Sequence, residues 1–310
     1  MSDPKTNQYS ATAPAIARLV AQHLVMKPYI WSAVTVNIHG LRNLDDLKPP
    51  FVVIANHSSH LDAPLIFGAL PRRLSQSLAT ATAGDYFFNS WYKALPTKLF
   101  FNSFPVFRQG HANRTGQRGL AAKLVNDGIP ILIFPEGTRS RTGAMANFTP
   151  GAAALSISRN APILPMALGG AYAAMPYGAT VPVPGRPHVH VVFGRPLRAT
   201  PGETANHFAE RLHRYVVELH DSTARAYGMP TQADFARAVA LRSAATRADQ
   251  DAEGAVRADP EPPAQVAEPM DEQKVTPLEP PEQIVPLSPP EQIVPLSPPD
   301  PDEPSEPERS

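Results

Sequence analysis

The fold is indicated most clearly by residues 51–64, Phe51-Val52-Val53-Ile54-Ala55-Asn56-His57-Ser58-Ser59-His60-Leu61-Asp62-Ala63-Pro64. Residues 51–55 are apolar and rich in β-branched side chains, which is typical of a strand buried in a parallel sheet. Asp62 and Pro64 then mark the start of a helix, because proline is tolerated in a first helical turn. The stretch therefore predicts a strand, a polar turn and a helix in direct succession.

The polar turn offers a base and an acid, His57 and Asp62, within one short segment. In a regular helix, residues at this spacing lie about 140° apart, so they can meet only if His57 precedes the helix and Asp62 begins it. A carboxylate in that position accepts the Nδ1 proton and leaves Nε2 free to take a proton from a substrate hydroxyl. The alternative is that Asp62 only caps the helix and His57 is an ordinary loop residue. The spacing alone leaves both interpretations open.

Strands and helices are also predicted to alternate along the rest of the chain. We expect strands at residues 35–39, 51–55, 104–107, 129–134, 163–168 and 189–193, and helices at residues 14–25, 65–70, 115–126, 151–159, 203–227 and 231–247. Apolar strands separated by helices indicate an α/β fold with a mostly parallel sheet that is flanked by helices on both faces. The site of such a fold lies where strands end and helices begin.

Two specific motifs fall at predicted strand ends. The pattern Asn-His-x-Ser-x-x-Asp is matched from Asn56 to Asp62, with Ser59 as the usual serine and Ser58 under looser patterns. The pattern Phe-Pro-Glu-Gly-Thr-Arg-Ser occupies residues 134–140. In this order and about eighty residues apart, they resemble the first and third motifs of the glycerolipid acyltransferase family, which contains the lysophosphatidic acid acyltransferases.

Two weaker motifs extend the resemblance over residues 36–220. Residues 104–108 match the second family motif, which ends in an arginine, here Arg108. Residues 161–166 match the fourth motif, a hydrophobic strand punctuated by prolines. The chain departs from many members at residues 149–150, Thr-Pro, where those members have a lysine nearby.

The resemblance implies acyl transfer from a thioester to a hydroxyl, without an acyl-enzyme intermediate. His57 would deprotonate the acceptor hydroxyl, and Asp62 would orient and stabilise the imidazolium. Acyl-CoA or an acyl-carrier protein would be the donor, no bound cofactor would be needed, and a lysophospholipid such as 1-acylglycerol 3-phosphate would be the acceptor. The resemblance assigns acceptor binding to Arg108, Glu136, Gly137, Thr138 and Arg139. Arginine suits this role because its planar fork donates two parallel hydrogen bonds to a phosphate.

Other functions fit the same motifs. Glycerol 3-phosphate, a sugar lipid or a lyso-amino-acid lipid are alternative acceptors within the enzyme class. A slow thioesterase would use water in place of the alcohol. A non-catalytic lipid-binding scaffold would keep the fold without the chemistry, but the intact His57 and Asp62 argue against it.

Several kinds of site are excluded by what the sequence lacks. The chain has no Cys, which excludes thiol catalysis, disulfides and thiolate metal sites. It has neither a Gly-x-Ser-x-Gly elbow nor a Walker phosphate loop. No second cluster of ligands follows His57 and His60, so we expect no metal site. His188 and His190 alternate along a predicted strand and are expected to face solvent.

The C-terminal residues 251–310 differ in composition from the rest of the chain. They hold 16 of the 37 prolines, and they repeat Pro-Pro-Glu-Gln-Ile-Val-Pro-Leu-Ser in tandem from Pro280 to Ser297. So proline-rich a segment cannot bury enough apolar surface to fold, which predicts a disordered tail. The expected domains are an N-terminal segment at 1–34, an acyltransferase domain at 35–228, a helix at 229–250 and the tail.

The net charge of zero conceals an asymmetry between this tail and the rest. Acids outnumber bases by 15 to 3 in residues 251–310, which leaves 25 bases and 13 acids, of the 28 of each, for the rest of the chain. A basic body favours anionic lipids or phosphorylated substrates as partners. Because no nucleic-acid motif accompanies these bases, we expect no nucleic-acid partner.

Residues 17–34 form the longest apolar segment near the N-terminus. It is interrupted by Gln22, His23, Lys27 and Pro28. It is therefore not expected to span a bilayer, which needs about 20 predominantly apolar residues. Its aromatic residues beside a lysine predict an amphipathic helix in the membrane interface, with ordinary packing on the domain as the alternative. We expect peripheral or monotopic attachment at the cytoplasmic face of a membrane.

Overall fold

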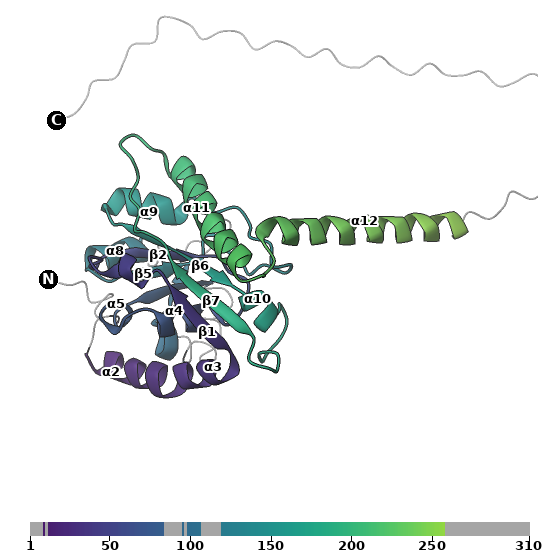
Figure 1. The fold of residues 1–310 in the computed structure, drawn as a ribbon. Helices are drawn as coiled ribbons and strands as arrows, with labels where there is room; N and C mark the ends of the chain where they lie inside the picture. The colour runs from purple at the N-terminus through teal and green to yellow at the C-terminus, as the bar shows by residue number, and fades with distance from the viewer. Residues whose placement is uncertain (1–8, 10–11, 84–94, 96–97, 107–118, 258–310) are drawn as a thin grey trace, which may run out of the picture. The chain divides into compact units, whose positions relative to one another are not determined.

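The computed structural model in Figure 1 describes residues 9, 12–83, 95, 98–106 and 119–257. Two predictions fall outside these residues: the binding role of Arg108, and the disorder of the tail beyond Arg257. Both stay predictions. The residues that carry the first and third motifs are all described, and they decide how the candidate site is built.

The described residues form a seven-stranded sheet in the order β1-β7-β6-β2-β5-β3-β4. Its strands are β1 (Thr35–His39), β2 (Val52–Ala55), β3 (Ala79–Ala83), β4 (Phe104–Val106), β5 (Ile131–Ile133), β6 (Ile163–Gly169) and β7 (His188–Phe193). Neighbouring strands run parallel, except that β6 and β7 are antiparallel. The predicted α/β class with a mostly parallel sheet is confirmed.

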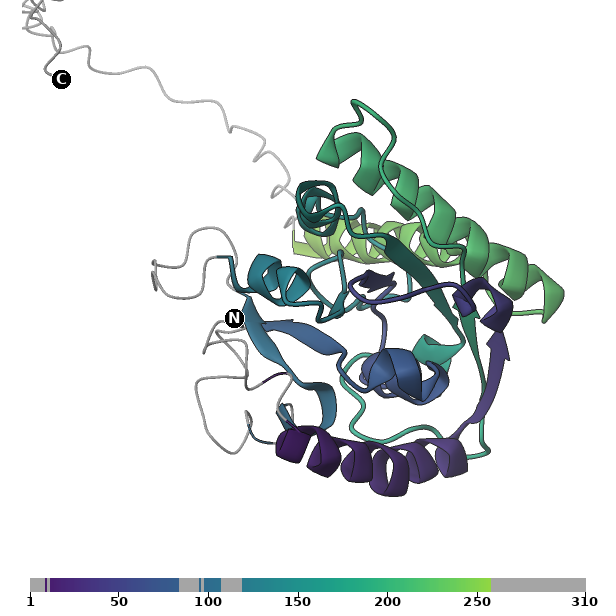
Figure 2. The same ribbon diagram turned by 90° about the vertical axis from the view of Figure 1, so that its left-hand side faces the viewer.

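Helices cover both faces of this sheet. They are α2 (Thr12–Val20), the π-helical η1 (Ala21–Met26), α3 (Lys27–Ala33), the 3₁₀ turn η2 (Leu41–Leu44), α4 (Asp62–Ala69), α5 (Arg72–Ser75), α8 (Leu120–Asn126), α9 (Gly151–Arg159), α10 (Ala171–Ala174), α11 (Ala205–Ala226) and α12 (Gln232–Arg257). One core cluster packs α8, α9 and α11 on one face, and a second packs η1, α3 and α4 on the other. Figures 1 and 2 show these two layers on opposite sides of the strands.

The central strand β2 explains why the sequence there is apolar at every position. Val52 and Ile54 belong to the core cluster under α9 and α11, whereas Val53 and Ala55 belong to the cluster under α4. All four residues are fully buried. Successive side chains of a strand point to opposite faces, so a strand covered on both sides needs apolar residues without alternation.

Two element predictions need correction. β3 was not expected, because its sequence Ala-Thr-Ala-Thr-Ala lacks the large β-branched and aromatic side chains that favour strands; it forms by pairing with β5 and β4. Helix α12 continues to Arg257, so the predicted boundary of the tail at residue 251 is wrong. The physical reason is that alanine and arginine favour helix, and no proline occurs between Pro230 and Pro260.

The N-terminal helical region is longer than expected, since α2, η1 and α3 follow one another without a break. Pro28 is tolerated because it lies in the first turn of α3, directly after the π-helical segment. Trp31 packs so closely on α4 that a Cβ atom at Gly68 would lie 2.5 Å from its ring. Within the described part of the chain, no helix is both long and apolar enough to cross a bilayer.

Candidate active site

The first and third motifs meet at one edge of the sheet. Residues 56–62 follow the carboxyl end of β2, and residues 134–140 follow the carboxyl end of its neighbour β5. Because β2 and β5 are parallel, both polar segments emerge on the same side. Asn56 ties this edge to β6, since its side chain donates to the Leu168 carbonyl at 3.1 Å and accepts from the Leu168 N–H at 2.8 Å.

His57 and Asp62 are in direct contact. The Nδ1 atom of His57 lies 2.8 Å from Oδ2 of Asp62, which also accepts the N–H groups of Ser58 at 2.7 Å and Ser59 at 2.8 Å. Asp62 is fully buried, and 22% of the His57 side chain is exposed. These donors precede α4, and the helix has no side-chain cap. Of the two interpretations that the sequence left open, the structure therefore supports the His57–Asp62 pair.

The face of the His57 ring rests on Phe134 from the third motif. The two ring centroids are 3.9 Å apart, and the planes are inclined by only 16°. Within the described residues, Nε2 of His57 has no hydrogen-bond partner. The ring is thus held at one nitrogen and along one face, while its second nitrogen is unoccupied. The spacing of the motifs contains no signal for this stack, because it depends on how two loops pack.

Glu136 lies beside this pair and is also buried. Its Oε1 accepts the N–H of His57 at 2.6 Å, and its Oε2 accepts the N–H of Ala146 at 2.9 Å. Burial raises the pKa of Glu136 to about 7, although these two hydrogen bonds favour the ionised form. Both oxygens of a residue predicted to bind the acceptor are therefore already engaged by the chain's own backbone.

The residues of the third motif that follow Glu136 are more exposed to solvent than Glu136. Thr138 is exposed and Arg139 is half-buried. Gly137 has a φ of +74°, which favours glycine, and a Cβ atom there would meet nothing within 4 Å. The Arg139 guanidinium lies 5.1 Å from the ring centroid of Tyr177, and that of Arg141 lies 5.4 Å from it. Tyr177 was not predicted from the sequence, because it follows α10 in the segment Pro-Tyr-Gly and belongs to none of the motifs.

Two other predictions concern histidines and metals. His188 is exposed as expected, but the same expectation for His190 is wrong, because only 2% of His190 is exposed. It is covered by Tyr227, whose ring centroid lies 4.2 Å away, and it contacts Nε2 of His39 at 3.0 Å. Among the described residues, no group of three or more His, Cys, Asp or Glu side chains is arranged to hold a metal ion.

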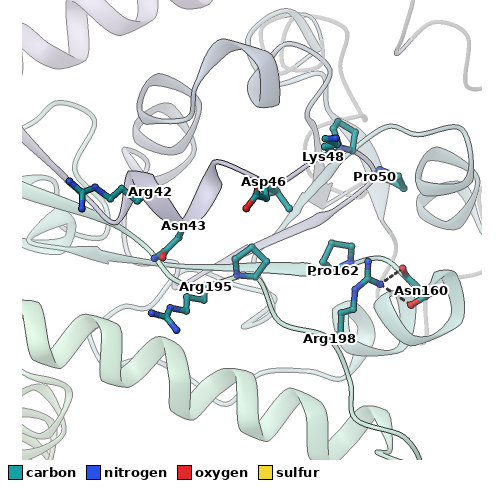
Figure 3. A pocket seen from close by; sticks show the side chains of 12 residues that line it. Arg42, Asn43, Asp46, Lys48, Pro50, Asn160, Pro162, Arg195 and Arg198 are labelled. Atoms are coloured by element: carbon teal, nitrogen blue, oxygen red, sulfur yellow. Dashed lines mark hydrogen bonds between the residues drawn. The ribbon is translucent and has the colours of Figure 1, made fainter.

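A separate cavity of about 590 Å³ lies at the other end of β2 (Figure 3). Pro50 and Pro162, which precede β2 and β6, contribute to its walls, and Arg198 at its edge donates to the Asn160 side chain at 2.8 Å. No residue of the first or third motif lines this cavity. It is therefore distinct from the candidate active site at the carboxyl end of β2.

Comparisons with known proteins agree with the motifs. Residues 35–169 match the family model described as Acyltransferase. The chain is 26% identical over 166 residues to the 1-acyl-sn-glycerol-3-phosphate acyltransferase BAT2, chloroplastic, of Brassica napus, a match that covers 51% of this chain and 45% of that protein. It is 29% identical over 175 residues to a 1-acyl-sn-glycerol-3-phosphate acyltransferase of Chlamydomonas reinhardtii, covering 52% and 48%. The match thus spans about half the length of these curated relatives.

A solved structure is also similar. It is that of the 1-acyl-sn-glycerophosphate (LPA) acyltransferase PlsC from Thermotoga maritima, with a TM-score of 0.47 and 22% sequence identity. The similarity covers 64% of this chain and 80% of that one. The family match and the curated relatives support the motif-based resemblance to the glycerolipid acyltransferase family.

Proposed function

We propose that this chain, which matches the Acyltransferase family model over residues 35–169, moves a fatty acyl group from a thioester to a lysophospholipid hydroxyl. The proposed acceptor is 1-acylglycerol 3-phosphate. The observation that carries the proposal is the contact of 2.8 Å between His57 Nδ1 and Asp62 Oδ2, with Nε2 of His57 unoccupied within the described residues. A histidine held in this way is arranged to accept a proton at Nε2.

The reaction then needs only one base and no covalent intermediate. As the acceptor oxygen bonds to the thioester carbonyl carbon, Nε2 of His57 takes the hydroxyl proton. The carbon–sulfur bond breaks, and the leaving thiolate receives the proton back from the imidazolium. Asp62 stabilises that imidazolium by its charge, and the ring of Phe134 adds a cation–π contact along the imidazole face.

The proposed acceptor carries a phosphate, which Arg139 and Arg141 would bind. Both guanidinium groups lie against one ring, that of Tyr177. Within the described residues neither has an ion-pair partner. Two like charges held close together repel each other, and a bound dianion would offset this repulsion. Arg108 and Thr138 remain predicted contributors to the same acceptor.

The donor and the place of reaction are further parts of the proposal. Acyl-CoA or an acyl-carrier protein would supply the thioester. The N-terminal helices support attachment to a membrane surface, because their outward face exposes Ile16, Val20, Leu24, Val25 and Tyr29. Their inward face is fixed by polar contacts of 2.6 Å each, from Arg18 to Asn102 and from Gln22 to the Phe100 carbonyl. An apolar face directed outward fits a membrane interface, and we place it at the cytoplasmic face.

The function is tested by thiol release from acyl-CoA, measured with 1-acylglycerol 3-phosphate, with its dephosphorylated counterpart and without acceptor. We expect release that depends on the acceptor and a higher kcat/KM for the phosphorylated one. Arg139→Lys keeps the charge but loses the planar fork, so it should raise the KM of the phosphorylated acceptor. Arg225→Lys, in a surface ion pair with Glu218, is the matched control.

Each contrary result points to a different alternative. Equal release without acceptor would identify a thioesterase. No thiol release from acyl-CoA, nor from an acyl-carrier protein in a parallel assay, would favour the scaffold. A preference for the dephosphorylated acceptor would contradict the phosphate assignment.

Membrane attachment is tested by sedimentation with anionic liposomes. The double variant Leu24→Glu, Val25→Glu places charges on the outward face and should sediment less than wild type. Leu241→Glu, at a residue of α12 that is 66% exposed, adds a charge elsewhere and serves as the control. Equal sedimentation of the double variant and wild type would exclude this face as the membrane contact.

A further inference from the structure

Glu136 joins three segments of the candidate site through a single carboxylate. It belongs to the loop after β5, whereas His57 belongs to the turn after β2 and Ala146 lies ten residues beyond Glu136. One oxygen accepts the N–H of His57 at 2.6 Å and the other accepts the N–H of Ala146 at 2.9 Å. Only 8% of Glu136 is exposed. A buried carboxylate that accepts one hydrogen bond at each oxygen is satisfied by the protein alone.

The same loop also holds the other side of the His57 backbone. The N–H of Ser140 donates to the His57 carbonyl at 2.8 Å, and Phe134 packs against the imidazole ring. The backbone N–H, the backbone carbonyl and the ring of His57 are therefore each contacted by a residue of the third motif. Among these contacts, that from Glu136 is the one made by an ionisable group.

We infer that Glu136 is a positioning residue, which fixes the backbone of His57 against the loop after β5 and does not bind the acceptor. The inference rests on the proposed function, because positioning matters only if His57 is the base. A displacement of about 1 Å at a reacting group can cost about 10²-fold in rate. The position of His57 relative to the acceptor would then depend on the Glu136 carboxylate.

This arrangement requires the ionised carboxylate. An ionised carboxylate only accepts, whereas a protonated one carries an O–H that opposes one of the two N–H groups. Burial raises the pKa of Glu136 to about 7, and the charge of Asp62 raises it as well. The Glu136 carboxylate contacts His57 through the backbone N–H, and the titratable imidazole of His57 has Asp62 as its own partner. The link between the two loops should therefore weaken as the pH falls through about 7.

Glu136→Gln tests the inference through the separation of kcat from KM. The amide keeps the size but offers one acceptor, so one of the two N–H groups loses its partner. We expect kcat to fall about 10- to 100-fold, with the KM of the acceptor within about twofold of wild type. A rise in KM with unchanged kcat would mean that Glu136 binds the acceptor, and would overturn the inference.

Gln232→Leu is the matched control. The Gln232 side chain accepts the N–H of Met145 at 2.6 Å, so its loss disturbs the segment next to Ala146 without a contact to His57. We expect its kcat to remain within about threefold of wild type. An equal fall in kcat for both variants would indicate general loosening of the loop and would contradict a specific role of Glu136.

A measurement on the wild-type chain separates this inference from the proposed function. In the full chain, the amide proton shifts of His57 and Ala146, followed by NMR, should titrate together near pH 7, the region to which burial raises the pKa of Glu136. In Glu136→Gln this shared titration should be absent. Independent titration, or none, would overturn the inference even in an active enzyme. If the two amide protons titrate together but the chain has no acyltransferase activity, the contacts of Glu136 are supported and only the proposed function is rejected.

Discussion

Two histidine clusters of this molecule differ in the partner that each ring has. In the active-site cluster, His57 faces the carboxylate of Asp62 at 2.8 Å. In the second cluster, Nε2 of His39 faces Nδ1 of His190 at 3.0 Å, with Tyr227 packed against His190. A carboxylate stabilises a protonated imidazole, whereas a second imidazole opposes it, because two cations at this distance repel.

The comparison teaches that the partner determines what a histidine can do. His57 can take up a proton during a reaction because Asp62 is already in place to compensate the charge. His39 and His190 can share their hydrogen bond only if at least one of the two facing nitrogens carries no proton. Burial, followed by the charges of His39 and His188, lowers the pKa of His190. We therefore expect the first cluster to serve catalysis and the second to serve stability.

The largest expected effect comes from deleting the ring in each cluster. His57→Ala should lower kcat by about 10²- to 10⁴-fold, the usual contribution of a general base, while the protein remains folded. His190→Gln should leave kcat within about threefold of wild type, because His190 lies in the other cluster. The measurement is the steady-state kcat of each variant, with circular dichroism spectra that match wild type to show that the variant is folded. Near-normal turnover in a folded His57→Ala protein would remove the distinction between the clusters.

A somewhat smaller loss is expected when only the charge of the partner is removed. Asp62→Asn can keep all three hydrogen bonds, because they converge on Oδ2 and a single amide oxygen can replace it. The imidazolium would nevertheless lose its compensating charge, so kcat should fall by at least about 10²-fold.

Asp221→Asn is the control for this second prediction. Asp221 also lies 2.8 Å from a histidine Nδ1, that of His220, but outside the candidate site. The kcat of Asp221→Asn should equal that of wild type. If Asp62→Asn were as active as Asp221→Asn, the charge of Asp62 would have no part in catalysis.

Replacing the aromatic ring of Phe134, which lies beneath His57, should lower kcat by a few-fold. Phe134→Leu keeps an apolar contact but removes the cation–π interaction with the imidazolium, which is worth about 0.5–1 kcal/mol. This corresponds to a decrease in kcat of about two- to fivefold. Tyr227→Leu, at the ring that covers His190, should not change kcat. Single-turnover rates measure the chemical step directly, and an unchanged rate in Phe134→Leu would show that the ring only fills space.

The smallest effect should appear in stability and not in rate. The pKa of His190 is lowered in the folded state, so the unfolded chain binds more protons, and this group's contribution is lost as the pH falls below about 6.5. The raised pKa of Glu136 acts in the opposite direction, but it does so equally in wild type and in His190→Gln. When the pH is lowered from 7.5 to 5.5, the urea midpoint of His190→Gln should therefore shift less toward instability than that of wild type. An equal shift in the two proteins would mean that the second cluster does not respond to pH.

Much of the sheet and the two main site residues could be predicted from the sequence. The strand at β1 and the helix at α9 have the predicted bounds, and the resemblance of the first motif implied the His57–Asp62 pair that the structure contains. The strand β3 could not be predicted, because its alanines and threonines become a strand only between β4 and β5. The burial of His190 escaped prediction for a related reason, since Tyr227, which covers it, comes from the end of α11.

The sequence by itself determined the α/β class, the resemblance to the glycerolipid acyltransferase family and the identity of the candidate base and acid, because apolar runs, turn residues and contiguous motifs are local patterns. Only the tertiary structure decided which atoms face one another. It brought Phe134 under the His57 ring, engaged both oxygens of Glu136 with backbone N–H groups, and placed the guanidinium groups of Arg139 and Arg141 near the ring of Tyr177. These contacts join segments that are distant in the chain, and their geometry depends on how strands pair and helices pack, which no local pattern contains.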